Sequence, residues 1–266
     1  MSLVDVHFSD FFNVDPDVIT AYNAFNISLI RDLPLFIDPF LLFNSEDEDY
    51  QAMHEGIIQY LQFLRDESAE AHLQPSVIPN WYYFPEVKQT WLGFSKFGND
   101  GRGLGKKFAE ALRDNLGALF DDIRQERITK GTHLEKLTLF DSGVGRDMVS
   151  DFTTNLIKQH LCKYTQNFAR QYLQSNQCKQ VSVEKARFNY RTKSWERQVF
   201  ELPWYRNDFV ILCPVDLLTR ADNWINRSDL IQNFEVIAQS LPDKQLVAQM
   251  NAYLRTAVDP NAAAKD

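Results

Sequence analysis

Four polar residues near the middle of the sequence have the spacing of one face of a helix. Asp147, Asp151, Asn155 and Lys158 follow the stretch GVGR. At about 100° per residue they fall within one arc of a helix predicted over residues 146–173. Carboxylates four residues apart can share a divalent cation, and Asn155 adds a neutral oxygen one turn later. The spacing therefore predicts a metal site at Asp147, Asp151 and Asn155, with Mg²⁺ as the cation.

The same arc has a second interpretation, as the acidic and solvated start of a helix. The helix macrodipole favours acids in the first turns. The arc also points away from Val149, Phe152, Leu156 and His160, which we expect to face the core. We favour this interpretation, because a metal site needs further acids from other elements.

Two acids elsewhere in the chain are the candidates for completing a catalytic site with Asp147 and Asp151. Asp38 lies within the apolar run LFIDPFLLF, where a buried carboxylate must be paired, hydrogen-bonded or metal-bound. An Asp before Pro39 is also the pattern of a helix N-cap with proline in the first turn, which we favour. Asp216 follows the buried stretch FVILCP, and strand ends are where sites often gather.

A glycine cluster with adjacent cations is a candidate for anion binding. The stretch GNDGRGLGKK contains Gly101, Gly103, Gly105, Lys106 and Lys107 and precedes a predicted helix. Backbone amides at a helix N-terminus can hold a phosphate or a carboxylate. The spacing matches no nucleotide-binding motif. A flexible loop is therefore the favoured interpretation.

The sequence does not match other common catalytic motifs. The five histidines lack the paired spacing of zinc hydrolases, and no G-x-S-x-G elbow occurs. Glu184 and Lys185 are adjacent, without the carboxylate-x-lysine spacing of metal-dependent nucleases. The three cysteines are far apart and without CxxC spacing, which indicates reduced thiols.

Composition and charge limit the classes of function. The 266 residues are 44% hydrophobic and include 20 Phe, which is typical of a globular chain with a sizeable core. A net charge of −8 provides no long-range attraction for a polyanion. The N-terminus lacks the basic and apolar regions of a signal peptide, and no apolar run is long enough to span a membrane. We expect a soluble cytoplasmic protein.

The periodicity predicts an α+β fold that is helix-rich and has a small mixed or antiparallel sheet. The sheet includes a β-hairpin near residues 180–203, with a bulge near Ala186, and a buried strand near 208–213. Helices are expected over residues 15–25, 47–67, 104–123, 146–173, 228–239 and 244–258. WYYFP (81–85) and TWLGFS (90–95) are expected to be strands or extended aromatic segments, and EKLTLF (135–140) a short strand. We predict one globular domain over residues 1–258 and a flexible tail over 259–266.

Several phrases resemble an uncharacterised family of bacterial cytosolic proteins, some of them found in phage-defence gene neighbourhoods. They include LPLFIDPFLLFNS (33–45), FPEVKQTWLGFSKFGNDGRGLG (84–105), GRDMVSDFTTNLI (145–157), YTQNFA (164–169) and FVILCPVDLLTRADNWINRSDL (209–230). In that family the segment after the late strand usually reads Pro-Lys-Asp. Here it reads Pro214-Val215-Asp216, so the resemblance weighs against catalysis by a lysine at this position.

The sequence therefore predicts a bacterial cytoplasmic binding or assembly component, with a protein partner or a second copy of the chain, in an antiviral defence or stress system. The alternative is a divergent Mg²⁺-dependent nuclease or phosphohydrolase, which uses the acids named above to organise the attacking water. Nucleic acid is a partner only under this alternative, and no membrane partner is expected.

Overall fold

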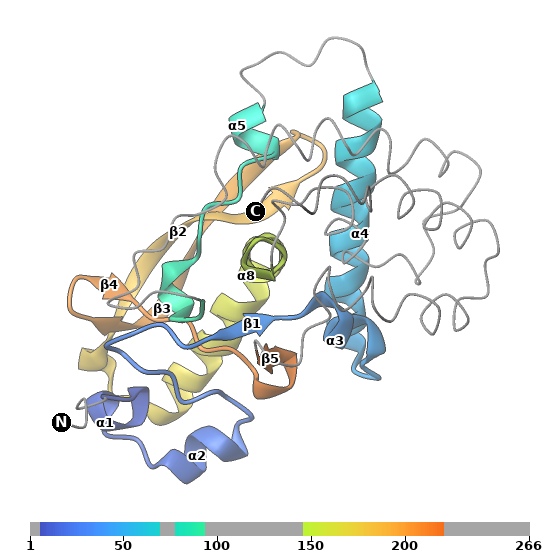
Figure 1. Ribbon diagram of the computed structural model, residues 1–266. Coiled ribbons are helices and arrows are strands. Elements are labelled where there is room, and N and C mark those ends of the chain that lie inside the picture. The colour runs from blue at the N-terminus through green and yellow to red at the C-terminus, as the bar shows by residue number, and fades with distance from the viewer. Residues whose placement is uncertain (1–5, 70–77, 94–145, 221–266) are drawn as a thin grey trace, which may run out of the picture. The chain divides into compact units, whose positions relative to one another are not determined.

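The computed structural model describes residues 6–69, 78–93 and 146–220 (Figure 1). They lie in one compact unit, Met1–Asn223. The predicted helices over 104–123, 228–239 and 244–258 and the strand over 135–140 fall outside the described residues. The predicted single domain to residue 258 and its tail stay predictions for the same reason.

The predicted α+β class is confirmed. Helix α8 (Arg146–Tyr172) is the longest described helix and packs against strands β2 and β3 and against helix α4 (Figure 1). Its sequence has no glycine or proline to interrupt it. Thr153, Thr154 and Thr165 are buried in it, and each hydroxyl donates to the carbonyl four residues earlier. The helix can therefore be buried on several sides without leaving these hydroxyls unsatisfied.

The predicted hairpin is confirmed, including its bulge. Strand β2 (Cys178–Asn189) pairs antiparallel with β3 (Ser194–Tyr205), and β4 (Asp208–Phe209) pairs with the end of β3. The register shifts between Val183 and Arg187, so that residues 184–186 stand opposite residue 197 alone. The bulge moves Lys185 out of regular strand geometry, with φ at 49°.

The predicted strand over residues 208–213 forms only its first two residues as β4. Val210, Ile211, Leu212 and Cys213 are fully buried but lie outside any strand. Their backbone bonds go to four different segments: Val210 N to Pro203 O, Ile211 N to Gln89 O, Leu212 N to Thr165 Oγ1, and Cys213 O from Phe25 N. Surrounding segments satisfy this backbone in place of a neighbouring strand.

The ambiguous run LPLFIDPFLLF contains two short elements. Strand β1 (Leu35–Ile37) pairs antiparallel with β5 (Leu218–Arg220), and helix α3 (Pro39–Asn44) follows directly. Helix α4 (Glu48–Ala69) comes next and matches its predicted span. It buries one apolar stripe, and the Oη atom of Tyr60 donates to the carbonyl of Trp81 at 2.7 Å.

Of the two alternatives for WYYFP and TWLGFS, strands are wrong in the described part: residues 83–87 lie outside any helix or strand, and Leu92 forms an isolated bridge with Leu33. Residues up to Trp81 form helix α5 (Ile78–Trp81), and residues 88–90 form the 3₁₀ helix η1 (Lys88–Thr90). The aromatic side chains of this segment form hydrogen bonds with residues that are distant in the sequence. The indole Nε1 of Trp81 donates to Lys193 O, and Tyr82 Oη donates to Leu64 O.

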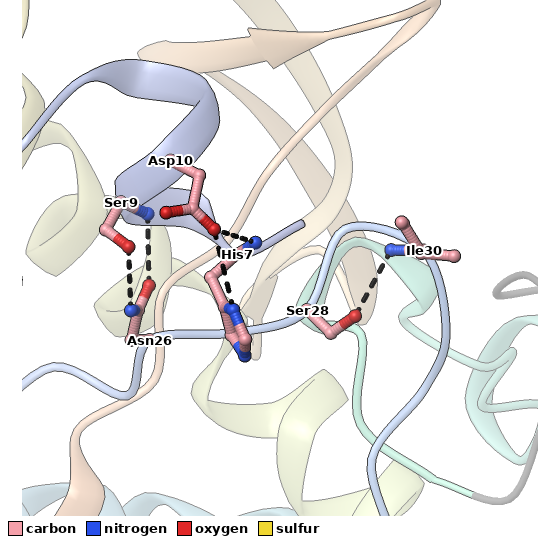
Figure 2. A network of polar contacts seen from close by, with 6 residues as sticks. All are labelled: His7, Ser9, Asp10, Asn26, Ser28 and Ile30. Atoms are coloured by element: carbon pink, nitrogen blue, oxygen red, sulfur yellow. Dashed lines mark hydrogen bonds and ion pairs between the residues drawn. The ribbon is translucent and has the colours of Figure 1, made fainter. Parts of the chain in front are cut away.

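The N-terminal segment adds a second apolar cluster against the end of α8. Helix α1 (Phe8–Phe12) begins where the amide of His7 donates to Asp10 Oδ2 at 2.8 Å (Figure 2). Ser9 and Asn26 exchange two hydrogen bonds, of 3.0 and 2.9 Å, which tie α1 to the chain beyond helix α2 (Pro16–Ala21). The cluster beneath comprises Phe8, Phe12, Ile19, Ile27, Leu29, Phe168, Val210 and Leu212, among others.

Within the residues that the structure describes, no helix combines the length and the apolar character needed to cross a bilayer. The three cysteines are free thiols, and Cys162 and Cys213 are buried.

Candidate functional site

Asp38 is the N-cap of helix α3, as the Asp-Pro pattern predicted. Its Oδ1 accepts from the amide of Phe40 at 2.9 Å, and Pro39 occupies the first helical position. Burial raises the pKa of this carboxyl, and the Phe40 bond opposes that shift. A cap of this kind contributes about 1 kcal/mol to the stability of a helix. The N-cap role therefore explains why the Asp38 carboxylate is buried at this position.

Asp216 lies on the neighbouring 3₁₀ helix η4 (Val215–Leu217) and accepts a hydrogen bond from a tyrosine. Its Oδ1 accepts from Tyr50 Oη at 2.9 Å. Burial, and then the Asp216 carboxylate, raise the pKa of the Tyr50 phenol. The amide of Asp38 donates to Leu217 O at 3.0 Å. The structure therefore brings the predicted Asp38 and Asp216 onto two elements that are bonded to each other.

The start of α8 belongs to the same corner of the molecule. The amide of Ile37, one residue before Asp38, donates to Ser150 Oγ at 3.0 Å, and Ser150 immediately precedes Asp151. Asp147 lies in the first turn of α8, and its side chain falls outside the part that the structure describes. Among the described residues, no three His, Cys, Asp or Glu side chains gather closely enough to hold a metal ion. The Mg²⁺ site at Asp147, Asp151 and Asn155 stays a prediction.

The expectation that this arc of α8 faces solvent is wrong for its second half. Asn155 is 1% exposed and Lys158 is 7% exposed, whereas the predicted core residues Leu156 and His160 are only partly buried. The physical reason is that other segments of the chain cover this face of α8, which the periodicity of α8 alone cannot indicate. Asn155 Nδ2 donates to Pro85 O at 2.7 Å, and the bulge of β2 lies over Lys158.

Lys158 is the buried cation of this covered face. The hydrogen bond of its Nζ goes to the carbonyl of Glu184 in the β2 bulge, at 3.5 Å. Burial lowers the pKa of Lys158 to about 8; Cys162 opposes this shift, and Lys185 adds a smaller lowering effect. An ammonium group that loses its water without a carboxylate partner carries a substantial free-energy cost.

Lys185 is the bulge residue itself and supplies the second cation. Its Nζ donates to Pro79 O at 3.3 Å and to Tyr83 O at 3.1 Å, and it lies 5.7 Å from the centroid of the Tyr83 ring. Burial lowers its pKa as well. The left-handed φ of this non-glycine residue costs free energy, and backbone strain of this kind is common at functional sites.

Asn155, one turn before Lys158, carries a buried and unsatisfied oxygen. Its Nδ2 donates to two carbonyls, Pro85 O at 2.7 Å and Asp151 O at 2.8 Å, which fixes the orientation of the amide. Its Oδ1 is buried and has no hydrogen-bond partner. An unsatisfied acceptor of this kind costs about 1–3 kcal/mol unless a ligand or water supplies a donor.

Helices α3 and η4 each expose an apolar side chain. Phe40 on α3 is 42% exposed and Val215 on η4 is 45% exposed, and the two elements contact each other. We call these two side chains the Phe40–Val215 patch. The predicted anion-binding residues Gly101, Gly103, Gly105, Lys106 and Lys107 lie outside the described residues.

No curated protein and no solved structure matches the chain. A family model described as Domain of unknown function (DUF8370) matches residues 13–226, which cover β1, α3, α8, the hairpin and η4. The match includes every residue of the Asp38–Asp216 corner and of the lysine-bearing face of α8, and the expected membership of a family without an assigned activity is thereby confirmed. The chain belongs to the DUF8370 family.

Proposed function

We propose that the protein is a binding or assembly component whose protein partner docks on the Phe40–Val215 patch. The observation that carries this proposal is the exposure of two apolar side chains, 42% and 45%, on contacting elements that the Asp38 N to Leu217 O bond holds together. An aromatic anchor presented by a fixed backbone is the usual centre of a protein interface. The hydrogen-bonded Tyr50 and Asp216 supply a polar rim next to it.

The position of Val215 adds to this proposal. In the family that the sequence resembles, a lysine usually occupies this position, and an apolar residue there adds a second exposed apolar side chain on an element that contacts α3. Full burial of a Phe or Val side chain contributes about 1.5–3 kcal/mol. Phe40 and Val215 are already more than half buried, so removing water from the rest contributes roughly half of that for each. The resemblance to proteins from phage-defence neighbourhoods favours a partner from a defence or stress system, and a net charge of −8 disfavours a polyanion.

The test replaces both patch residues with serine, Phe40→Ser and Val215→Ser. Wild-type protein is expected to form a complex, seen as a defined mass by size-exclusion chromatography with light scattering, either alone or with a partner identified by mass spectrometry. The double variant is expected to lose at least tenfold in affinity for that partner, because the two truncations together remove about 1.4 kcal/mol or more.

Val199→Ser is the matched control, because Val199 is 64% exposed on β3, an element that does not include the patch. It should leave complex formation unchanged. A wild-type chain that stays monomeric and retains no partner, or a partner retained equally by the double variant, would refute the proposal.

One observation supports the alternative, a divergent Mg²⁺-dependent nuclease or phosphohydrolase. The bonds from Asp38 N to Leu217 O and from Ile37 N to Ser150 Oγ bring together segments that carry Asp38, Asp216 and Asp151. Under this alternative, Mg²⁺ or Mn²⁺ raises the melting temperature of the wild type, because a bound ion stabilises the native state. The shift should be lost in Asp151→Asn and kept in Asp10→Asn, which alters an exposed acid of α1. Equal shifts in all three proteins would exclude a shared ion at Asp151.

A further inference from the structure

The buried face of α8 places two ammonium groups next to one β-bulge. Lys158 approaches the carbonyl of Glu184, and Lys185 is the next residue along the chain. Lys158 is almost completely buried, whereas Lys185 is partly exposed. The pair therefore has a buried member and a member that solvent can reach. Two like charges so placed repel each other unless a negative group lies between them.

No carboxylate neutralises this pair within the described residues. Glu184 directs its side chain to Arg197, with Oε1 3.2 Å from Nη2, on the exposed face of the hairpin. The titratable side chains that act on Lys158 are Cys162, one turn further along α8, and Lys185. Cys162 is a buried thiol whose pKa is raised by burial to about 12, so it is neutral at pH 7. The site therefore has a net positive charge without a resident counter-ion in this part of the chain.

The two ammonium groups also have unused hydrogen-bond donors. A lysine ammonium has three N–H donors. Lys185 uses two of them, on Pro79 O and Tyr83 O, and Lys158 uses one in a long contact of 3.5 Å. An oxyanion can accept several N–H bonds at once, and its charge compensates the desolvation of the ammonium groups.

The unsatisfied Oδ1 atom of Asn155 narrows the class of ligand that can bind beside the two lysines. Asn155 and Lys158 are three residues apart on α8, and such residues are neighbours on a helix surface. Asn155 Oδ1 needs a donor, whereas the lysines need acceptors. A hydrogen phosphate group offers both, because it combines an O–H with charged oxygens. Chloride and a fully ionised sulfate offer acceptors alone.

We propose that Lys158, Lys185 and Asn155 form a binding site for a phosphate group, either free or as a monoester. The two lysines hold the charged oxygens, Asn155 Oδ1 accepts from the phosphate O–H, and Lys185 lies on the solvent side. This inference does not depend on the proposed docking of a protein at the Phe40–Val215 patch, which involves other elements.

The test compares melting temperatures at pH 6.5 and constant ionic strength in chloride, sulfate, inorganic phosphate and glycerol phosphate. At about 100 times its Kd, a phosphate ligand should raise the melting temperature by about 5–10 °C. Stabilisation by inorganic phosphate assigns the free ion as a ligand, and stabilisation by glycerol phosphate alone assigns a monoester. Chloride or sulfate equal in effect to both phosphates, or no effect of either phosphate, would overturn the proposal.

Single-residue variants test whether the phosphate-dependent rise in melting temperature arises at this site. Lys158→Met and Lys185→Gln should each abolish the phosphate-dependent shift, and Asn155→Leu should reduce the preference for phosphate over sulfate. Lys179→Met is the control: Lys179 is an exposed cation of the same strand, with Nζ 3.9 Å from the Trp204 ring. It should keep the full shift. Because Lys185 is partly exposed, Lys185→Gln remains informative even if changes at buried positions impair folding. A full shift in Lys185→Gln and Lys158→Met would place the anion elsewhere and refute the assignment.

Discussion

Lys158→Met is expected to raise the free energy of unfolding at pH 7, in phosphate-free buffer, by on the order of 3 kcal/mol. The reason is the buried ammonium, whose pKa of about 8 in the folded chain lies well below its usual value of 10.5. Methionine fills a similar volume without a charge, and replacing buried charges by apolar groups of similar size is often stabilising. Urea unfolding of both proteins measures the difference.

The gain from Lys158→Met should depend on pH with a defined sign. Below pH 8 the lysine is protonated in both states, so the desolvation cost is fully present. Between pH 8 and 10.5 the unfolded chain binds more protons than the folded chain, and the cost falls as pH rises. The stability difference between wild type and variant should therefore shrink through this window. Comparing the two proteins cancels the tyrosines and cysteines that titrate at similar pH.

Lys163→Met is the control for this experiment, because Lys163 is an exposed lysine on the same helix. Its effect should stay within about 0.5 kcal/mol at every pH. If Lys158→Met instead destabilises the protein at pH 7, the ammonium has a stabilising partner, and the unpaired-cation description of this face is wrong.

Phe168→Ala should lower the free energy of unfolding by about 3–5 kcal/mol, because truncating a buried aromatic side chain leaves a cavity. Phe168 is fully buried near the end of α8. Its ring centroid lies 5.8 Å from that of Phe8 and 5.1 Å from that of Tyr22. It therefore joins the long helix to the N-terminal segment, and its loss should loosen both. Denaturant unfolding, with the m-value monitored, tests this expectation.

Tyr172→Ala is the matched control on the same face, one turn further along α8. Like Phe168, Tyr172 packs against Tyr22, with ring centroids 6.0 Å apart, and its ring centroid lies 5.0 Å from that of Phe168, but Tyr172 is 38% exposed. Less apolar surface leaves water on folding, so the expected loss is about 1 kcal/mol. Equal losses for the two variants would show that burial of Phe168 is not what holds the N-terminal segment in place.

Local patterns in the sequence predicted the elements whose formation depends on neighbouring residues. The 3.6-residue period gave the spans of α4 and α8, and an Asp-Pro pair marked the starts of both α2 and α3. The slip in alternation near Ala186 correctly indicated the bulge in β2. In each case the deciding contacts lie within a few residues of one another.

Features that depend on distant partners escaped prediction. The aromatic run after residue 80 has the propensity of a strand, yet Trp81 bonds to Lys193 and Tyr82 to Leu64, so tertiary contacts decided its conformation. The direction of the polar arc on α8 was wrong because Pro85 and Glu184 cover it. The sequence correctly placed Lys158 on the same arc as Asn155. It did not predict the burial of Lys158, which depends on the contact between α8 and the bulge of β2.

The segment over residues 210–213 has a consequence for the order of folding. Its peptide groups bond to the end of β3, to η1, to α8 and to the chain near residue 25. All four of those segments precede it in the chain, so during synthesis they have no common partner until residue 213 has emerged. Contacts over such long sequence separations are slow to form, because ordering the intervening chain costs entropy first. This part of the fold therefore forms late, and its formation joins segments near residues 25, 89, 165 and 203 through one short stretch.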